Sequence, residues 1–479
     1  MKEAITICFN EWRYWSRTWL AVTVALLTLI LVAISVFATF SQIANEKNTR
    51  ESLQVKAEQT FRSQPARHPH RMVHYGHYVF RTPTALAALD PGVDPLTGTV
   101  MFLEGHRQNS AAFSSQYDGA QAGAISRLSP AVAYQLLVPL VLIVIGFSVL
   151  AREREASTDR QLVSHGIAPT SIWLGKTLAL GIVALLLLLP MVLGMLLTNV
   201  EWRMGFGFIS LYFLYLAVWV LIITAVSTWS RSTSHALFIL LASWLALCIL
   251  LPRFAVSTAN TVIPNASQIE TDMDVIVALR SLGDGHNASD PAFKKLQANL
   301  LEQYKVETLD ELPINFRGVV AKTAEADLTA VLNEYAEKRM AAQQAQTQWL
   351  KSYQFVSPFL ALQSASMIAA GTDGRTHHRF LQEAEAVRFE FVQALNNIHE
   401  HELAYSDDIN LSKDEESQRR TRVNADNWRL LNDFRFEADP ADTRFQRLLS
   451  TYMVLLLWTV IFILAGVLGA RRLPEVNGG

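Results

Sequence analysis

The stretch LALGIVALLLLLPMVLGMLL at residues 178–197 contains no charged residue. At 1.5 Å per residue, a helix of about 20 apolar residues crosses the ~30 Å hydrocarbon core of a bilayer. Five further stretches of similar composition occur in the 479-residue chain, which is 51% hydrophobic and 18% charged. A soluble chain carries about 25% charged residues. The sequence therefore predicts an all-α polytopic membrane protein with six transmembrane helices.

The six spans can be placed from the apolar stretches, and the remaining segments follow from them. We place the spans at 18–40, 131–150, 172–198, 209–228, 235–251 and 449–470. Residues 1–17 mix aromatic with charged side chains, which is typical of an amphipathic helix that lies in the membrane interface. The other segments are two long hydrophilic ones, one connector and a tail: 41–130, 252–448, 151–171 and 471–479.

Lys and Arg residues predict the orientation, because they favour the cytoplasmic side of short loops. Ten Lys and Arg residues fall in the segments that the six spans place on one side of the membrane. The short loop 199–208 on the other side holds one, Arg203. Both termini are therefore expected in the cytoplasm, with 41–130 and 252–448 outside. The second of these segments holds 21 Lys and Arg against 29 Asp and Glu, as expected for a hydrated domain. Cys8 and Cys248 fall on opposite sides, so we expect no disulfide.

The two outer segments have helical patterns. Residues 41–62 lack Pro and Gly, so the first span is expected to continue as a helix beyond the membrane. Apolar stripes predict helices at about 323–351 and 376–404, and 99–104 is a short strand candidate. The segment 41–130 is too short for a large core of its own. We therefore expect both segments to build one joint, mainly helical domain.

The composition also limits the classes of function. A net charge of −2 gives no basic surplus for nucleic acid. No acyl-transfer motif occurs, so we expect a non-catalytic chain without a cofactor of its own. No ionisable residue lies deep within a span, although ion-coupled carriers use such groups as relays. The energy for any transport is therefore expected to come from another chain.

A histidine-rich strip between Arg67 and His77 is the main metal candidate in the sequence. Imidazole is a ligand of Zn²⁺ or Cu²⁺, and His74 and His77 are the candidate ligands. Two arginines, Arg67 and Arg71, would repel a cation, and neither Cys nor carboxylate lies in the strip. We therefore expect packed or solvated histidines here, and no metal.

The connector 151–171 carries the most informative motif and is expected to form a short surface helix and a turn. The run Glu153-Arg154-Glu155-Ala156-Ser157-Thr158, with the later Leu162, Gly166, Pro169 and Gly175-Lys176, resembles the E-x-E-x-G-T…L-L…P…G-K segment of ABC-2-type transporter permeases. Ser157 stands where Gly is usual in that family, and Asp159 where Leu is usual. The resemblance implies a coupling role for this set: Glu153, Arg154, Glu155, Thr158, Arg160, Leu162, Gly166 and Pro169.

The outer segments resemble a bacterial subgroup of these permeases that has large extracytoplasmic loops. This resemblance rests on four stretches: His74–Phe80, Leu89–Asp94, Leu103–Asn109 and Ser357–Phe359. It implies a multi-pass protein of the bacterial inner membrane, with residues 1–17 as the elbow helix of the family. The chain would be the permease subunit of an ATP-driven exporter, surrounded by lipid and paired with a second, identical or paralogous permease chain.

In this reading, ATP and Mg²⁺ bind to a separate cytoplasmic ABC ATPase. Two alternatives stay open. In the first, the permease transmits mechanical work to an envelope partner and moves nothing through its spans. In the second, the chain is a membrane-tethered binding or sensing protein that does not use ATP.

Overall fold

The computed structural model describes residues 1–111, 129–197, 199–411, 414–430 and 434–472. Within these residues, six helices are long and apolar enough to cross a membrane. Three of these candidate spans are each a single uninterrupted helix: α10 (Pro169–Leu196), α11 (Trp202–Trp229) and α21 (Ala441–Ala470). The first candidate is the front part of α2 (Leu20–Arg62). The other two are composite, Pro130–Glu155 and Thr233–Val262.

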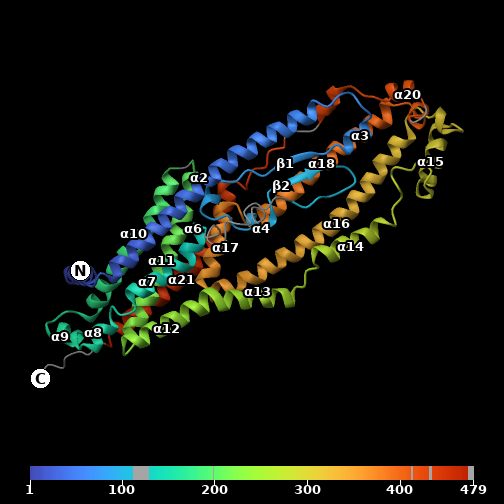
Figure 1. The fold of residues 1–479 in the computed structure, drawn as a ribbon. Coiled ribbons are helices and arrows are strands. Elements are labelled where there is room, and N and C mark those ends of the chain that lie inside the picture. The colour runs from blue at the N-terminus through green and yellow to red at the C-terminus, as the bar shows by residue number, and fades with distance from the viewer. Residues whose placement is uncertain (112–128, 198, 412–413, 431–433, 473–479) are drawn as a thin grey trace.

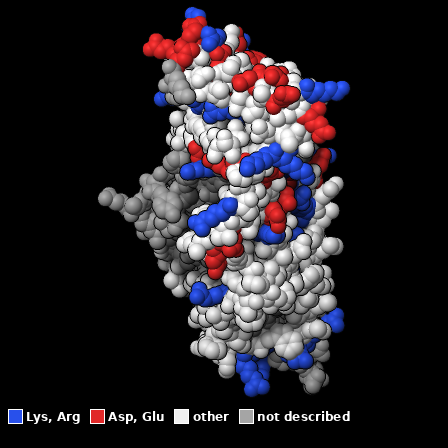
Figure 2. Space-filling view, turned by 90° about the vertical axis from the view of Figure 1, so that its right-hand side faces the viewer, with Lys and Arg blue, Asp and Glu red and all other residues white. Residues whose placement is uncertain are grey.

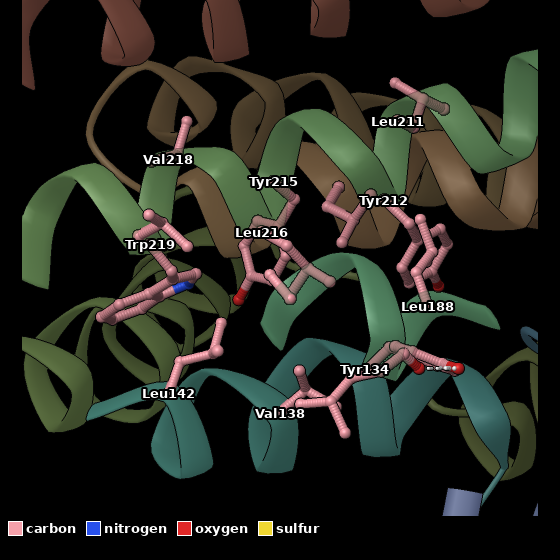
Figure 3. Packing of buried hydrophobic residues seen from close by; sticks show 14 of the residues in the cluster. Tyr134, Val138, Leu142, Leu188, Leu211, Tyr212, Tyr215, Leu216, Val218 and Trp219 are labelled. Carbon is pink, nitrogen blue, oxygen red and sulfur yellow. Dashed lines mark hydrogen bonds between the residues drawn. The ribbon is translucent and has the colours of Figure 1, made fainter. Parts of the chain in front are cut away.

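The centre of the helical bundle is α11. Its side chains Tyr212, Tyr215 and Trp219 are fully buried, and they face Tyr134 and Leu142 of the second span (Figure 3). About two thirds of the apolar window of α11 is buried inside the chain, against 17% for α2. The outer spans therefore present apolar side chains to their surroundings, as helices in contact with lipid do.

The two composite spans each contain a π-helical turn. The second span comprises α6 (Pro130–Val132), the π turn Ala133–Leu137, α7 (Val138–Gly146) and α8 (Ala151–Glu155). The fifth comprises α12 (Thr233–Leu245), the π turn Ala246–Leu250 and α13 (Leu251–Val262). It thus continues as a helix well beyond the predicted end of the span at 251.

The carbonyl groups at the π turns are bonded by side chains of neighbouring helices. Tyr215 donates to the Gln135 carbonyl at 2.6 Å, and the Trp244 ring donates to the Leu136 carbonyl at 3.1 Å. Ser357 donates to the Leu247 carbonyl at 2.8 Å. Backbone groups in an apolar medium require such partners. The turns are therefore fixed points of contact between helices.

The N-terminal segment forms a helix, α1 (Lys2–Thr18), which packs against α10; its position in the membrane interface stays a prediction. Trp19, with φ 58°, ends α1 and redirects the chain into α2. Figure 1 shows α1, α8, α9 (Thr158–Ser164) and the end of α21 at one end of the molecule, which we call the terminal end. Residues 473–479 of the predicted tail lie outside the described residues.

At the opposite end, the described residues of 41–111, 263–352 and 374–440 form an elongated helical region that we call the arm. Its long helices are the rear part of α2, α16 (Phe316–Ser352) and α18 (Gly374–Glu402). The strands β1 (His77–Phe80) and β2 (Val100–Leu103) pair antiparallel and lie beside α18 (Figure 1). Its shorter α-helices are α3 (Pro69–Val73), α4 (Asp94–Thr97), α14 (Gln268–Leu279), α15 (Lys294–Tyr304), α19 (Tyr405–Ile409) and α20 (Glu415–Arg420). The 3₁₀ turns are Ala85–Ala88, Pro291–Phe293, Leu309–Glu311, Tyr353–Phe355 beside the arm, and Ala425–Leu430.

The two long hydrophilic segments share the core of the arm, which confirms that they pack together. The Phe61 ring of α2 meets the Phe391 ring of α18 with centroids 5.2 Å apart. The buried Trp428 ring donates to the Gln64 carbonyl at 2.9 Å. The predicted helix at 376–404 and the strand candidate at 99–104 are confirmed within two residues by α18 and β2, and the predicted helix at 323–351 is confirmed by α16, which begins seven residues earlier, at Phe316.

One helix of the segment 252–448 lies within the bundle and not in the arm. Helix α17 (Pro358–Ala370) packs against α11 and α21. Its Leu360, Leu362 and Ala365 belong to the main core of the bundle, and Ser366 lies 2.8 Å from the Tyr212 hydroxyl. The sequence-based description of this whole segment as a hydrated domain is therefore wrong for α17.

The surface follows the same division. Figure 2 shows Lys, Arg, Asp and Glu gathered over the arm, and a lower part over the bundle with few charges. A few basic side chains reappear at the bottom of that view. This distribution fits an apolar belt of membrane thickness between two hydrated ends.

Candidate functional site

Four charged side chains meet where α1 crosses the terminal end of the bundle. Glu11 on α1 bonds Arg152 on α8 at 3.0 Å and Lys176 on α10 at 2.5 Å. Lys176 also bonds Glu153 on α8 at 2.6 Å. The Glu11 and Lys176 side chains are 1% and 6% exposed, and charges so far from water require opposite partners. This ion network joins α1 to the second and third spans.

A close approach of α1 to α10 makes the ion network possible. A Cβ atom at Gly175 would lie 2.6 Å from the Ala4 carbonyl oxygen and 2.7 Å from the Ile7 Cβ. Such contacts are too short for any larger residue without movement of the backbone of α1. Gly175 therefore lets α10 touch α1 at Ile7, one turn of α1 before Glu11, which bonds Lys176.

The chain turns sharply between α8 and α9. Ser157 has φ 57°, in the left-handed region that glycine adopts readily and that costs other residues about 1–2 kcal/mol. This conformation explains why Gly is usual at this position of the motif. After the corner, the Thr158 hydroxyl hydrogen-bonds the Glu153 carboxylate, so the corner is attached to the ion network.

Helix α8 is also attached to the connection between α11 and α12. Arg154 donates to the Ser230 carbonyl at 3.0 Å, and Glu155 accepts from the Thr233 amide at 2.9 Å. The Ser227 hydroxyl accepts from the amides that lead into α8 at 3.0 and 3.1 Å. The segment is thus bonded to α1, α10, α11 and α12, and its position depends on four helices.

The eight residues predicted for coupling divide into two sets. The first set makes the contacts within the chain described above: Glu153, Arg154, Glu155 and Thr158. The second set lies along α9 and the turn after it: Arg160, Leu162, Gly166 and Pro169. Arg160 and Gly166 are exposed, whereas Leu162 is half-buried against the bundle core and Pro169 begins α10. The coupling role of all eight residues stays a prediction.

Glu11 and Lys176 were not among the predicted site residues. They are 165 positions apart in the chain, so no local pattern joins them. The Glu at position 11 interrupts an otherwise apolar face of α1, which includes the buried Ile7 and Trp15. This charge on the apolar face of an amphipathic helix was the one sign in the sequence that Glu11 has a buried, oppositely charged partner.

The histidine strip separates in the structure. His77 lies on β1, is buried, and packs its ring against Phe61 with centroids 5.6 Å apart. His74 instead lies in a group with His70, His106 and His286, whose ring nitrogens come within 4.8 Å of one another. Carboxylates do lie beside this group, contrary to the expectation from the strip, because Glu325 bonds His106 at 2.8 Å.

A buried charge cluster fixes the middle of the arm. Arg388 on α18 is 1% exposed and bonds Glu325 on α16 at 2.5 Å and Glu385 at 2.7 Å. Burial would raise the pKa of Glu325, but the bonds from His106 and Arg388 hold that pKa below its usual range. Burial raises the pKa of Glu385. The cluster connects α16, α18 and the turn after β2.

Two parts of the chain match known families. Residues 103–269 match a family model described as ABC-2 family transporter protein. Residues 268–437 match a domain of unknown function (DUF3526). No curated protein matches the chain. The first match runs from the end of β2 to α13 and includes α6, α7 and the α8–α9 segment, and the second covers α14 to α20 with α17 among them. With its six candidate spans and N-terminal helix, the membrane part of the chain is similar to ABC-2-type transporter permeases over residues 103–269, and a large additional helical domain follows that match.

Proposed function

We propose that the chain is the transmembrane subunit of an ATP-driven exporter. A separate cytoplasmic ABC ATPase binds ATP and Mg²⁺ and docks on the α8–α9 segment, while the spans move a substrate out of the cytoplasm or the inner membrane. A second permease chain completes the pathway. The chain itself carries no ATP site and acts by transmitting movement.

The ion network of Glu11, Arg152, Glu153 and Lys176 carries this proposal. A docking segment transmits force only if it is joined rigidly to the helices that it must move. The α8–α9 segment is bonded to α1, α10, α11 and α12, while Arg160, Gln161 and Ser164 of α9 are exposed. The exposed side of α9 is therefore the docking surface that we assign to the ATPase.

The docking surface can be tested apart from the ion network. We expect Arg160→Glu with Gln161→Glu to reduce the amount of ATPase that co-purifies with the permease and to lower ATP turnover of the complex. The thermal stability of the permease should not change, because neither side chain is buried. Glu307→Lys, an exposed change in the arm, is the matched control.

Two results would contradict the docking assignment. The first is full retention of the ATPase by the α9 variant. The second is the absence of any co-purifying ATPase in gentle detergent, which would instead support the binding or sensing alternative. Glu153→Lys is a less specific test, since it would also place a third cation beside Arg152 and Lys176.

We further propose that the terminal end is cytoplasmic and that the arm faces the outside of the inner membrane. A thiol reagent that cannot cross membranes should then label Gln303→Cys in intact cells and label Gln161→Cys after lysis. Both positions are exposed, and the native Cys8 and Cys248 are buried. Labelling of Gln161→Cys in intact cells, with protection of Gln303→Cys, would invert the orientation.

The mechanotransmission alternative is favoured by one observation. Helix α2 is continuous for 43 residues, about 65 Å at 1.5 Å per residue, and runs from the membrane far into the arm. Movement at its membrane end would therefore reach the arm directly. Transport assays in vesicles distinguish the two functions: substrate-stimulated ATP turnover with accumulation supports export, and turnover that requires an envelope protein without accumulation supports mechanotransmission.

A further inference from the structure

Four imidazole rings from three distant parts of the chain meet at the surface of the arm. His70 lies on α3 and His74 directly follows it, His106 follows β2, and His286 lies between α14 and the Pro291–Phe293 turn. The distance between the Nε2 atoms of His70 and His74 is 3.2 Å, and that between His74 and His286 is 3.4 Å. The six ring pairs have centroid distances between 4.8 and 5.6 Å.

This spacing fits a tetrahedral metal site. Ligand nitrogens at 2.0–2.1 Å from a Zn²⁺ ion in tetrahedral geometry are about 3.3–3.4 Å apart. The two Nε2 distances at His74 lie at this value, and all four ligand atoms lie within 4.8 Å. Small side-chain rotations would therefore bring the remaining pairs to coordination distance.

The rings are oriented by groups at their other nitrogens. The Nδ1 of His106 lies 2.8 Å from the fully buried carboxylate of Glu325, and the Nδ1 of His286 lies 3.3 Å from Asp284. Metal-bound imidazoles usually bond a carboxylate or carbonyl through the second nitrogen, which sets the tautomer and the ring plane. The Nε2 of His106 is buried and has no hydrogen-bond partner in the described part of the chain.

The backbone at His106 supports the same arrangement. His106 has φ 64°, an unfavourable conformation for a residue with a side chain. Its backbone N–H donates to Glu325 at 3.2 Å, in addition to the contact of its ring. Since Glu325 is itself held by Arg388, the His106 ring is fixed before any ion binds.

The charge around the four rings is compatible with a cation. Arg67 and Arg71 line the same cavity as His70 and His286, but Arg67 donates to Gln64 at 2.8 Å and lies over the Tyr75 ring. On the other side, the carboxylates of Glu325 and Asp284 bond His106 and His286 and supply negative charge next to the rings.

A second histidine group nearby has different chemistry. The carboxylate of Asp408 is bonded by His399 at 2.7 Å and by His68 at 3.2 Å, and also accepts from Asn315 at 3.1 Å. Its oxygens therefore already have donors. The group lines the same cavity of about 460 Å³ as His70 and His286, which leaves the four-ring group accessible from that side.

We propose that a divalent transition-metal ion, with Zn²⁺ as the preferred ion, is bound by four imidazoles: His70, His74, His106 and His286. Because the protein would supply all four ligands, no position stays open for a water or substrate, which is the arrangement of a structural site and not of a catalytic one. The ion would attach the loop that carries His286 to α3 and to the turn after β2. This proposal does not depend on ATP coupling or on the direction of transport.

The test uses the full-length chain in detergent, stripped with a chelator and titrated with Zn²⁺ alone. We expect one high-affinity ion per chain, and with Co²⁺ the intense visible absorption of a tetrahedral nitrogen site. Zn²⁺ should also slow hydrogen exchange in residues 281–290. An octahedral Co²⁺ spectrum, or no binding, would overturn the proposal.

The variants separate loss of the site from loss of the fold. His286 is about half exposed, so His286→Gln should leave the melting temperature of the metal-free protein unchanged. Outer carboxylate partners contribute about 10–100-fold to metal affinity. We therefore expect about 10-fold or more weaker Zn²⁺ binding for Asp284→Asn and at least about 100-fold for His286→Gln. His401→Gln, an exposed histidine outside the group, is the matched control. Unchanged Zn²⁺ affinity in His286→Gln would contradict the assignment.

Discussion

Lys176→Met should destabilise the permease by about 3–5 kcal/mol, the usual consequence of removing one partner from a buried ion pair. The Lys176 ammonium bonds both Glu11 and Glu153, and both it and Glu11 are nearly inaccessible to water. Without it, two carboxylates would share Arg152. We expect a lower melting temperature in detergent, together with faster hydrogen exchange in α1 and α8.

The control for this variant is Arg203→Ala, which removes an ion pair between exposed side chains, Arg203 and Asp442. Such pairs contribute about 0–1 kcal/mol, so its melting temperature should stay close to that of the unchanged protein. The combined variant Glu11→Gln with Lys176→Met removes one carboxylate together with the cation and leaves Glu153 paired with Arg152, so it should recover part of the lost stability. A Lys176→Met protein as stable as Arg203→Ala would show that the ion network does not hold α1 to the bundle.

The second large effect is expected in the arm. Arg388→Met should cost about 3–5 kcal/mol, because it leaves Glu325 and Glu385 buried without their cation. Both carboxylates lie between α16 and α18, so these helices should separate while the spans stay folded. The measurement is limited proteolysis with hydrogen exchange, which should show loss of protection in α16 and α18 and little change in α11.

A control for Arg388→Met is available on the same helix. Arg375 is exposed near the start of α18, and Arg375→Met should leave proteolysis of the arm unchanged. Equal protection of α16 in the two variants would mean that the apolar contacts of α18, such as Phe391 with Phe61, hold the arm without the charge cluster.

The sequence predicts the long helices well because each carries its own signal. The apolar stretches indicate the spans, and the stripe that includes Phe380 and Leu395 indicates α18, where both side chains are fully buried. The extension of α2 follows from 22 residues without Pro or Gly at 41–62. In each case the information lies within one helix, so periodicity and composition suffice.

Features that depend on contacts between distant segments were not predictable in this way. Helix α17 has 13 residues, fewer than a span needs, and its apolar character has meaning only beside α11 and α21. The group around His74 requires His286, which is 212 positions away. Composition also cannot tell which way a charged side chain turns. The sequence did not indicate that Glu153 and Glu155 bond groups within the chain; their predicted coupling role stays a prediction.

The position of α17 limits how such permeases can be recombined. The two family matches meet at residues 268–269, as if the membrane part and the additional domain were separable modules. Yet α17, encoded in the middle of the second match, fills the core of the bundle and bonds Tyr212 of the first. A chimera joined at 268 would place an unrelated helix against α11 and leave a cavity or a clash in the bundle. Exchange of the additional domain between homologues is therefore expected to succeed only when the lining of α11 and α21 is exchanged with it.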